Sequence, residues 1–473
     1  MNRQPFPDID AIYFISPTKA SLDKVLLDFD PVAKYKSANL FFTSSLSQDL
    51  FTRLAQSKCA MFVEQFQEVY VDFLMYEQNL FTFSGPAADI KYNKFLDAGI
   101  SERLAAVCVS LNCNPTVIHD SKINSKTLAT NFIETMNDLA AKIKTELTTP
   151  AKLLIIDRSY DLVSPLIHDL HLQSLCLNLL ELDKIFEYSD ASKDRSLILE
   201  GEFWDRLKSK HIAECIEIIR KENNRLVAEG KIFEQSDLKS ALSALPQFNA
   251  RKQTIVAYTK LIQECMTKFE RGNLKLICDL EQDLCLNEDD VFDRLIQTLK
   301  QEDVQKQGKI RLLLIYLILK GFKESEMETI NLLDQETLAM LNSIQVFTGD
   351  FAKENFDKYK CEANPNDKFD YFHVPKLKTI LSELICDSLD EEQFHILKKQ
   401  TSKEKFSLRK KKITSKIIVF VIGGVSPSEI RVANDFSNEN DCEVVLGSSD
   451  LLTSEDFLSY LANCKQKEFF KSQ

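Results

Sequence analysis

The stretch at residues 153–170 reads LLIIDRSYDLVSPLIHDL. It begins with an uninterrupted apolar run, which is typical of a parallel strand that is buried on both faces. Three charged side chains follow directly, at Asp157, Arg158 and Asp161. Carboxylates at the carboxyl end of a parallel strand often take part in binding or catalysis. The stretch therefore predicts an α/β fold and leaves two hypotheses for its charged residues, an active site or a structural turn.

The first part of the chain alternates between strand and helix patterns. Strands are predicted at 10–16 (DAIYFIS), 39–43 (NLFFT) and 68–74 (EVYVDFL), with helices at 19–29 and 47–56. Strands separated by helices of this length require right-handed crossovers, which build a doubly wound parallel sheet. We therefore expect a first α/β domain over residues 1–114.

A second α/β unit is predicted from segments at both ends of the remaining chain. It contains strands at 116–120, 153–157, 416–424 and 442–448, and a long helix at 126–147. Ser426-Pro427-Ser428-Glu429 supplies an N-cap, a proline at the first helical position and a capping-box glutamate. Two terminal strands cannot bury both faces of a sheet alone, so we expect them to join the sheet of residues 153–157. The second domain is then discontinuous, 115–222 and 413–473.

The segment between these two parts has a helical pattern. Apolar residues recur at three- and four-residue spacing, and no proline occurs between Pro246 and Pro365. This predicts an inserted helical domain at 223–412. Residues 397–416 at its end are basic and polar without an apolar period, which predicts a solvated linker; a nuclear signal or a lipid-binding patch is the alternative.

Composition excludes several classes of protein. The net charge of −12 and the pI near 5.2 argue against nucleic acid as a partner, because phosphate binding needs a basic face. The longest apolar run, 312–319, is far shorter than the roughly 20 residues that cross a bilayer. The 12 cysteines are scattered, and the close pair Cys108 and Cys113 lacks further ligands at zinc spacing. The sequence therefore predicts a soluble, cytoplasmic protein with reduced thiols and no metal.

The catalytic hypothesis for Asp157 and Asp161 is a phosphotransferase or hydrolase. It lacks supporting motifs, because there is no GxxxxGK[ST] loop, no GxSxG and no HExxH. Ser164-Pro165 is predicted to start a helix, which favours a structural turn. His168 and His171 would share one helical face and could bind zinc, but no third ligand is evident, so a surface helix with two histidines is favoured.

The IGGVS turn at 422–426 allows two interpretations. Its free backbone N–H groups, at the start of a helix, could bind an anion. Alternatively, Gly423 and Gly424 let strand and helix approach closely. No further glycine continues a GxGxxG pattern, so no dinucleotide cofactor is expected.

The stretch at 153–170 resembles the LLILDR-x-x-D-x-x-SPL-x-H-x-L signature of the Sec-one/Munc-eighteen (SM) family. Other segments are similar to the family in the same order along nearly the whole chain. These segments are 10–29, 33–43, 203–214, 245–266, 279–284, 419–433 and 443–453.

The resemblance implies an arch of three domains, two with doubly wound parallel sheets and a helical one inserted into the second. Members bind syntaxin-type SNAREs, the vesicle SNARE and the assembled SNARE bundle, and have no known enzymatic activity or cofactor. Segments 33–43 and 281–284 are most similar to exocytic members. We therefore expect a monomeric scaffold or chaperone for SNARE assembly in docking and exocytosis, recruited peripherally to plasma or vesicle membranes through its partners.

Specific residues follow from the resemblance. The family's structural signature maps to Asp157, Arg158, Asp161, Ser164, Pro165, Gly423 and Gly424. Phe51 and Glu68 match its pocket for the syntaxin amino-terminal peptide, although ordinary helix packing would also explain Phe51. Arg311 and Ile344 match SNARE contacts on a projecting hairpin at about 309–346, and core packing is the alternative for Ile344.

Two departures from the family pattern are visible. Family members carry a further strand and helix before the strand at 10–16, so the first domain is expected to be abbreviated or truncated, which bears on the binding of closed syntaxin. The hairpin segment lacks the proline at which the family's long helix bends.

Overall fold

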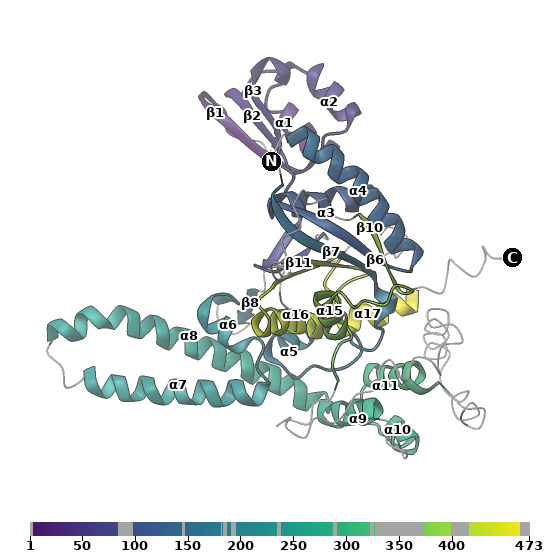
Figure 1. Cartoon of the computed structure of the whole chain (residues 1–473). Coiled ribbons are helices and arrows are strands. Elements are labelled where there is room, and N and C mark those ends of the chain that lie inside the picture. The colour runs from purple at the N-terminus through teal and green to yellow at the C-terminus, as the bar shows by residue number, and fades with distance from the viewer. Residues whose placement is uncertain are drawn as a thin grey trace, which may run out of the picture.

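The computed structural model describes residues 3–83, 98–143, 147–180, 182, 187–190, 195–233, 238–286, 291–321, 326, 373–398 and 416–463. Figure 1 shows a small sheet at the top, a larger sheet in the middle, and helices below it and to its left. This arrangement agrees with the α/β plus α architecture that the sequence predicts.

The small sheet contains β1 (Phe6–Ile15), β2 (Tyr35–Phe42) and β3 (Val63–Glu68), in that order and all parallel. Helices α1 (Lys19–Leu26) and α2 (Gln48–Ala55) and the 3-10 helix η1 (Lys58–Phe62) pack on one face. Tyr13, Leu40 and Phe42 of the sheet are buried beneath them. The predicted strand-helix alternation is therefore confirmed for this unit.

The predicted strand at 68–74 is wrong. The third strand is β3, and the chain turns after it at Tyr70, whose φ is +52°. The sequence of β3, VEQFQE, is polar and mostly exposed, because this strand forms an edge of the sheet. Because apolar and polar residues alternate only weakly in β3, the sequence pattern predicts a strand at the more apolar residues 68–74 instead.

The larger sheet has seven strands in the order β10-β6-β7-β11-β12-β5-β4. Their bounds are β4 Leu74–Glu77, β5 Leu80–Thr82, β6 Cys113–Asp120, β7 Thr149–Asp157, β10 Phe394–Lys398, β11 Lys416–Ile422 and β12 Glu443–Ser448. The five inner strands are parallel, and the edge strands β10 and β4 run antiparallel to their neighbours. β11 lies between β7 and β12, so the predicted return of the terminal strands to the sheet of Asp157 is confirmed.

Helices cover both faces of this sheet. α3 (Ala98–Ser110) and α4 (Ile123–Ile143) pack on one face, and α5 (Leu172–Leu179), α15 (Leu377–Cys386) and α16 (Pro427–Glu439) lie on the other. Successive residues of β7 point alternately to the two faces: Leu153 and Ile155 into the first core, Leu154 and Ile156 into the second. A strand buried on both faces must be continuously apolar, which explains the run that opens residues 153–170.

The strand pairing places the structural boundaries elsewhere than at the predicted residues 114 and 412. β4 and β5 belong to the larger sheet although they precede residue 114, and β10 and α15 belong to it although they precede residue 413. The edge strands β4 and β10 are short and antiparallel and β5 has only three residues, so these strands do not follow the strand-helix alternation that identifies the rest.

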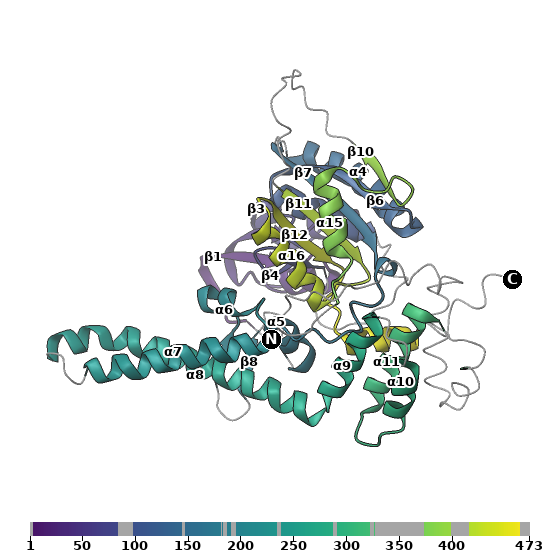
Figure 2. The same ribbon diagram turned by 60° about the horizontal axis from the view of Figure 1, so that its bottom comes forward.

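The helical part contains α6 (Gly201–Leu207), α7 (Ile212–Phe233), α8 (Leu238–Arg271), α9 (Leu274–Leu286), α10 (Val291–Leu299) and α11 (Lys306–Lys320). A short antiparallel pair, β8 (Glu187–Asp190) and β9 (Arg195–Ile198), precedes it. Figure 2 shows α7 and α8 side by side, projecting away from the sheets. The helices α9 to α11 share a separate core with α17 (Ser454–Asn463) and with four residues of the opening stretch, Leu162, Val163, Leu166 and Ile167.

One packing contact in the larger sheet leaves no room for a side chain. Gly447 in β12 lies beside Phe81 in β5, and a Cβ atom added to Gly447 would lie 2.0 Å from Phe81 Cζ. Phe81 is fully buried and stacks on Phe420, so it cannot move aside freely. We predict that Gly447→Ala destabilises the protein by about 1–3 kcal/mol through overpacking, as measured by urea denaturation.

Gly99→Ala is the matched control. Gly99 lies in α3 with no atom within 4 Å of an added Cβ. Alanine there is expected to leave stability unchanged or raise it by up to about 1 kcal/mol, because alanine favours the helix. A Gly447→Ala variant as stable as the wild type would contradict the packing described for β12.

Candidate functional site

Asp157 closes β7 and caps the short 3-10 helix η3 (Arg158–Tyr160). Its Oδ1 accepts from the backbone N–H of Ser159 at 3.0 Å, and its Oδ2 accepts from the side-chain amide of Asn124 at 3.3 Å. The side chain is almost completely buried. Both carboxylate oxygens therefore hold the turn together.

Asp161 is the most enclosed carboxylate of the opening stretch. It accepts hydrogen bonds from the backbone N–H groups of Val163, Ser164 and Lys376 and from the Ser164 hydroxyl. Burial by itself raises the pKa of Asp161, but the nearby positive charges, chiefly that of Arg158, bring the pKa below its ordinary value. Asp161 is therefore an ionised structural acceptor, which leaves neither carboxylate of the catalytic hypothesis facing a substrate.

Arg158 connects this turn to the carboxyl-terminal part of the chain. Its two terminal nitrogens donate to the two oxygens of Glu429, each at 2.7 Å, and it also donates to the backbone carbonyls of Asp161 and Gly424. Arg158 and Glu429 are 3% and 0% exposed. The Tyr160 hydroxyl also donates to Glu429. A bidentate pair of this kind has fixed geometry, so it locks β7 to the start of α16.

Glu429 is also the capping-box residue predicted from the sequence. It accepts from the backbone N–H of Ser426 at 2.8 Å, and α16 starts with Pro427 as expected. One carboxylate thus caps a helix and neutralises a buried guanidinium. The sequence predicted the first role and left the partner of Arg158 open.

The glycine turn between β11 and α16 permits a close approach of two chain segments. Gly423 and Gly424 have φ values of +99° and +103°, where a side chain is strained. A Cβ on Gly424 would lie 3.0 Å from Cβ of Leu452. The N–H of Gly423 donates to the Ser449 hydroxyl, so this group is not available to an anion. The turn therefore serves close packing, against the segment before α17.

The predicted helix start at Ser164-Pro165 is not present. These residues form a buried turn in which Ser164 Oγ donates to Asp161 at 2.6 Å and lies 3.0 Å from His373 Nε2. The carbonyl of Pro165 accepts from the Ser454 hydroxyl. The turn carries the chain from the core of the larger sheet into the core of the helical part.

The surface helix predicted for His168 and His171 is also wrong. Both residues precede α5, and His168 is buried. His171 contacts Asp169, whereas His168 contacts Glu281 in α9 and Arg311 in α11. The two histidines therefore have separate partners and do not form a joint zinc site.

His168, Cys278 and Glu281 have potential ligand atoms within 4.8 Å of one another, the one such trio in the part of the chain that the structure describes. Glu281 accepts from the His168 ring at 2.8 Å and from its backbone N–H. The guanidinium of Arg311 contacts the same ring and lies 4.0 Å from Glu281. Arg311 already supplies the positive charge that a metal would bring, so the trio is a buried polar link between helices and turn.

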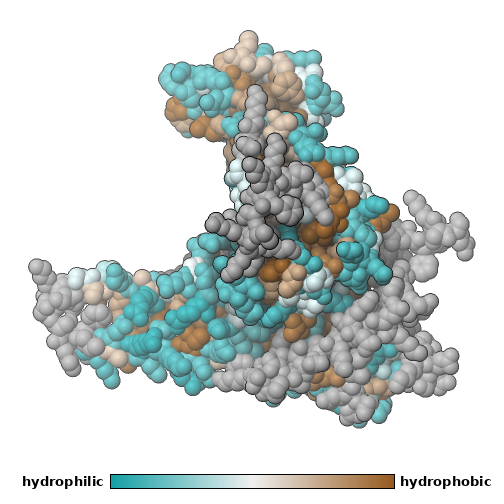
Figure 3. Space-filling model, viewed as in Figure 1, coloured by the Kyte–Doolittle hydropathy of each residue, from teal (hydrophilic) through white to brown (hydrophobic). Residues whose placement is uncertain are grey.

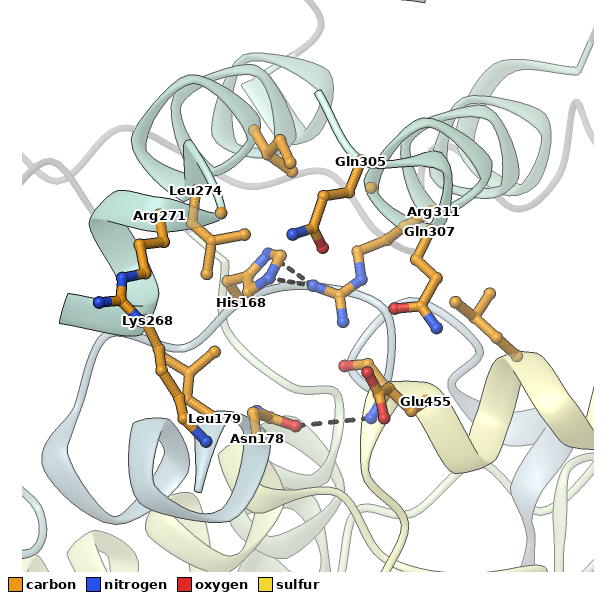
Figure 4. A pocket seen from close by; sticks show the side chains of 15 residues that line it. His168, Asn178, Leu179, Lys268, Arg271, Leu274, Gln305, Gln307, Arg311 and Glu455 are labelled. Carbon is orange, nitrogen blue, oxygen red and sulfur yellow. Dashed lines mark hydrogen bonds between the residues drawn. The ribbon is translucent and has the colours of Figure 1, made fainter. Parts of the chain in front are cut away.

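Arg311, predicted to contact SNAREs, is buried at the wall of a pocket between the helical part and the larger sheet unit. Figure 4 shows its side chain turned toward His168 and the interior of this pocket. Ile344 and the hairpin beyond residue 321, apart from 326, lie outside the described residues, as do residues 399–415 of the predicted linker.

Phe51 lies on α2 and is 45% exposed. Its ring packs edge-to-face against Phe66 of β3, which is 39% exposed, with the ring centroids 5.7 Å apart. Phe66 in turn contacts the buried Phe42 of β2. Phe42 thus supports the aromatic pair from the sheet, and the outer side of the pair is exposed to solvent. Such a surface suits an apolar anchor of a bound peptide.

Glu68, at the end of β3, positions this surface. Its carboxylate accepts from the backbone N–H of Leu46 at 2.8 Å and from the Tyr70 hydroxyl at 2.6 Å. Burial, followed by the hydrogen bond to Glu68, raises the pKa of Tyr70 to about 12. Glu68 therefore holds the loop that leads into α2, the helix of Phe51, and the structure brings the two predicted residues to the same end of the small sheet.

Two residues, Phe66 and Glu281, and the pairing of Glu429 with Arg158 are absent from the sequence-based predictions. Phe66 was overlooked together with the polar strand β3. Glu281 and the partnership of Glu429 with Arg158 depend on contacts between distant segments. The sequence does carry a signal for Glu281, because this charged residue lies on the apolar side of α9. In the structure its side chain is fully buried.

The pair of Arg158 and Glu429 leads to a stability prediction. Glu429→Gln removes the negative charge and leaves the buried guanidinium of Arg158 uncompensated. We expect a loss of about 3–5 kcal/mol in the free energy of unfolding, measured by urea denaturation.

Glu439→Gln, at the other end of α16, is the matched control. Glu439 pairs with Lys378 at 3.4 Å, and both side chains are about half exposed. Its loss is expected to change stability by at most about 1 kcal/mol. Equal effects of the two substitutions would show that the buried pair is not a special constraint.

Comparisons with known proteins agree with this geometry. The family model described as the Sec1 family matches residues 1–460. The "Protein transport protein sec1" of Schizosaccharomyces pombe is 24% identical over 533 aligned positions, covering 98% of this chain and 77% of that protein.

Two solved structures share the fold. The Unc18–syntaxin 1 complex from Monosiga brevicollis has a TM-score of 0.76 at 22% identity, covering 98% of this chain and 89% of that one. Sly1p in complex with an N-terminal peptide of Sed5p also has a TM-score of 0.76, at 20% identity, covering 98% and 86%. The match of the family model over residues 1–460 shows that this protein belongs to the Sec1 family, the SM family suggested by residues 153–170.

Proposed function

We propose that this protein is a SNARE-binding scaffold that binds a syntaxin and promotes or regulates SNARE assembly in vesicle docking and exocytosis. Its membership of the Sec1 family carries this proposal. Relatives with the same fold are described in complex with syntaxin 1 and with an N-terminal peptide of Sed5p. The name of the Schizosaccharomyces pombe relative supports a role in protein transport.

The protein acts by binding rather than by catalysis. The carboxylates of Asp157 and Asp161 accept hydrogen bonds from their own turn, and both side chains are buried. A general base or metal ligand needs access to a substrate, and neither has it. The phosphotransferase or hydrolase hypothesis therefore has no support from the geometry.

The aromatic pair of Phe51 and Phe66 is the proposed anchor for the amino-terminal peptide of the syntaxin. Apolar anchors surrounded by a polar rim carry most of the energy of such interfaces. Polar side chains of β3 and the internally bonded Glu68 border the pair. Glu68 contributes by fixing the loop before α2, so that the aromatic rings are already in place when the peptide arrives.

The shape of the molecule supports a second surface for longer SNARE segments. Figure 3 shows a recess between the unit formed by β1 to β3 and the projecting α7–α8 pair.

No helix in the described part of the chain is long and apolar enough to cross a bilayer. We therefore propose that the protein reaches plasma or vesicle membranes peripherally, through the SNAREs that it binds.

Phe51→Asp tests the peptide surface. A carboxylate in place of the ring should weaken binding of a syntaxin amino-terminal peptide by at least about tenfold, because an apolar anchor is lost and a charge is desolvated. The dissociation constant can be measured by isothermal titration calorimetry with the full chain.

Val32→Asp is the matched control. Val32 is 76% exposed and precedes β2, whereas Phe51 follows it, so the two lie at opposite ends of the small sheet. The control is expected to bind the peptide as the wild type does. Unchanged binding by Phe51→Asp would place the peptide elsewhere, and failure of the wild type to bind any syntaxin would overturn the proposed function.

A further inference from the structure

A pocket of about 300 Å³ lies where the helical part meets the larger sheet unit. The end of α8 and the starts of α9 and α11 form one side, and α5, the turn at His168 and the start of α17 form the other (Figure 4). We call it the α11 cleft. Its volume is at the lower end of the range of small-molecule sites, roughly 300–1,000 Å³.

Positive charge dominates the lining of the α11 cleft. Lys268, Arg271 and Arg311 line it, opposed by one acidic side chain, Glu455. Neither Lys268 nor Arg271 pairs with a carboxylate among the residues that the structure describes. In a protein with a net charge of −12, such a concentration of cations in one concave site favours an anion as ligand.

Arg311 is the buried member of this group. Its side chain is 9% exposed, and the nearest carboxylate, Glu281, lies 4.0 Å away and is shared with His168. Burial, only partly offset by Glu281, lowers the pKa of Arg311. Burial lowers the pKa of His168 and favours its neutral ring, which adds no charge beside Arg311. Glu281 thus supplies one negative charge beside Arg311, which leaves the charges of Lys268 and Arg271 for an anion in the cleft.

The start of α11 adds hydrogen-bond donors. Gln305 is its N-cap, in extended conformation and without a side-chain capping bond, and Gln307 and Gly308 also line the cleft. The unpaired N–H groups of a helix start and its macrodipole favour negative charge. The side-chain amide of Asn178 lies on the opposite wall.

We propose that the α11 cleft binds the phosphate groups of a small phosphorylated molecule of the inositol phosphate type, either free or as the head group of a lipid. Guanidinium, ammonium and amide donors around one cavity match the several oxygens of a phosphate monoester, and guanidinium groups bind them bidentately. A carboxylate offers two oxygens and would leave most of these donors unused.

Such a ligand would connect two units of the protein. Lys268, Arg271 and Arg311 belong to the helical part, whereas Asn178 belongs to α5, which packs on the larger sheet. Binding would therefore stabilise the position of the helices relative to the sheet. This inference does not depend on the proposed SNARE binding.

The test uses the full chain and isothermal titration calorimetry at low salt, with inositol trisphosphate and inorganic phosphate as probes. Lys268→Gln/Arg271→Gln should weaken inositol trisphosphate binding by at least about tenfold, because two charge-assisted bonds are lost. Glu455→Gln should strengthen it by about three- to tenfold, because a like charge is removed. Circular dichroism checks that each variant is folded.

Lys221→Gln/Lys252→Gln is the matched control, since it removes the same two charges from exposed positions of α7 and α8 outside the cleft. It should bind as the wild type does. No binding by the wild type, or equal losses in both double variants, would overturn the proposal, because the second result would indicate non-specific attraction. An unchanged affinity of Glu455→Gln would also place the ligand elsewhere.

A second experiment distinguishes the two sources of the phosphate. Vesicles with and without phosphatidylinositol bisphosphate are floated with the wild type and with Lys268→Gln/Arg271→Gln. Flotation that requires the lipid and both cations identifies a head group, whereas calorimetric binding without flotation identifies a free inositol phosphate. Binding of an acidic peptide in place of either probe would refute the phosphate assignment.

Discussion

The buried ion pair between Arg158 and Glu429 is the constraint on which the rest of the structure depends. It joins the end of β7 to the start of α16, two segments that are 271 residues apart in the chain. Each partner satisfies further groups, Arg158 the carbonyls of Asp161 and Gly424, and Glu429 the N-terminus of α16. Removing either partner would leave a buried charge alone, so the two halves of the larger sheet unit are held in one register.

The opening stretch is therefore a junction between two cores. Its first five residues lie in the strand β7, and Leu162, Val163, Leu166 and Ile167 lie in the core of α9, α10, α11 and α17. Asp157 and Asp161 fix the angle between these parts by accepting backbone hydrogen bonds. Their burial explains how a pair of carboxylates that resembles an active site serves a scaffold.

A scaffold of this kind can present binding surfaces at a distance from one another. The aromatic pair of Phe51 and Phe66 is on the small sheet unit, and the α11 cleft lies between the helices and the larger sheet. The first is apolar and open, which suits a peptide anchor, and the second is cationic and recessed, which suits a small anion.

The sequence by itself determined the parallel strands, the return of the terminal strands to the sheet of Asp157, the capping box at Ser426 and the family, because apolar periodicity and capping are local properties. Tertiary structure alone decided that β4, β5 and β10 complete the sheet, that Phe66 supports Phe51, and that Glu429 neutralises Arg158. Strands of three to five residues are too short to show a period, and contacts such as that of Arg311 with His168 join segments 143 residues apart. No local pattern records which distant partner a buried charge selects, since folding brings the two together only in the finished core.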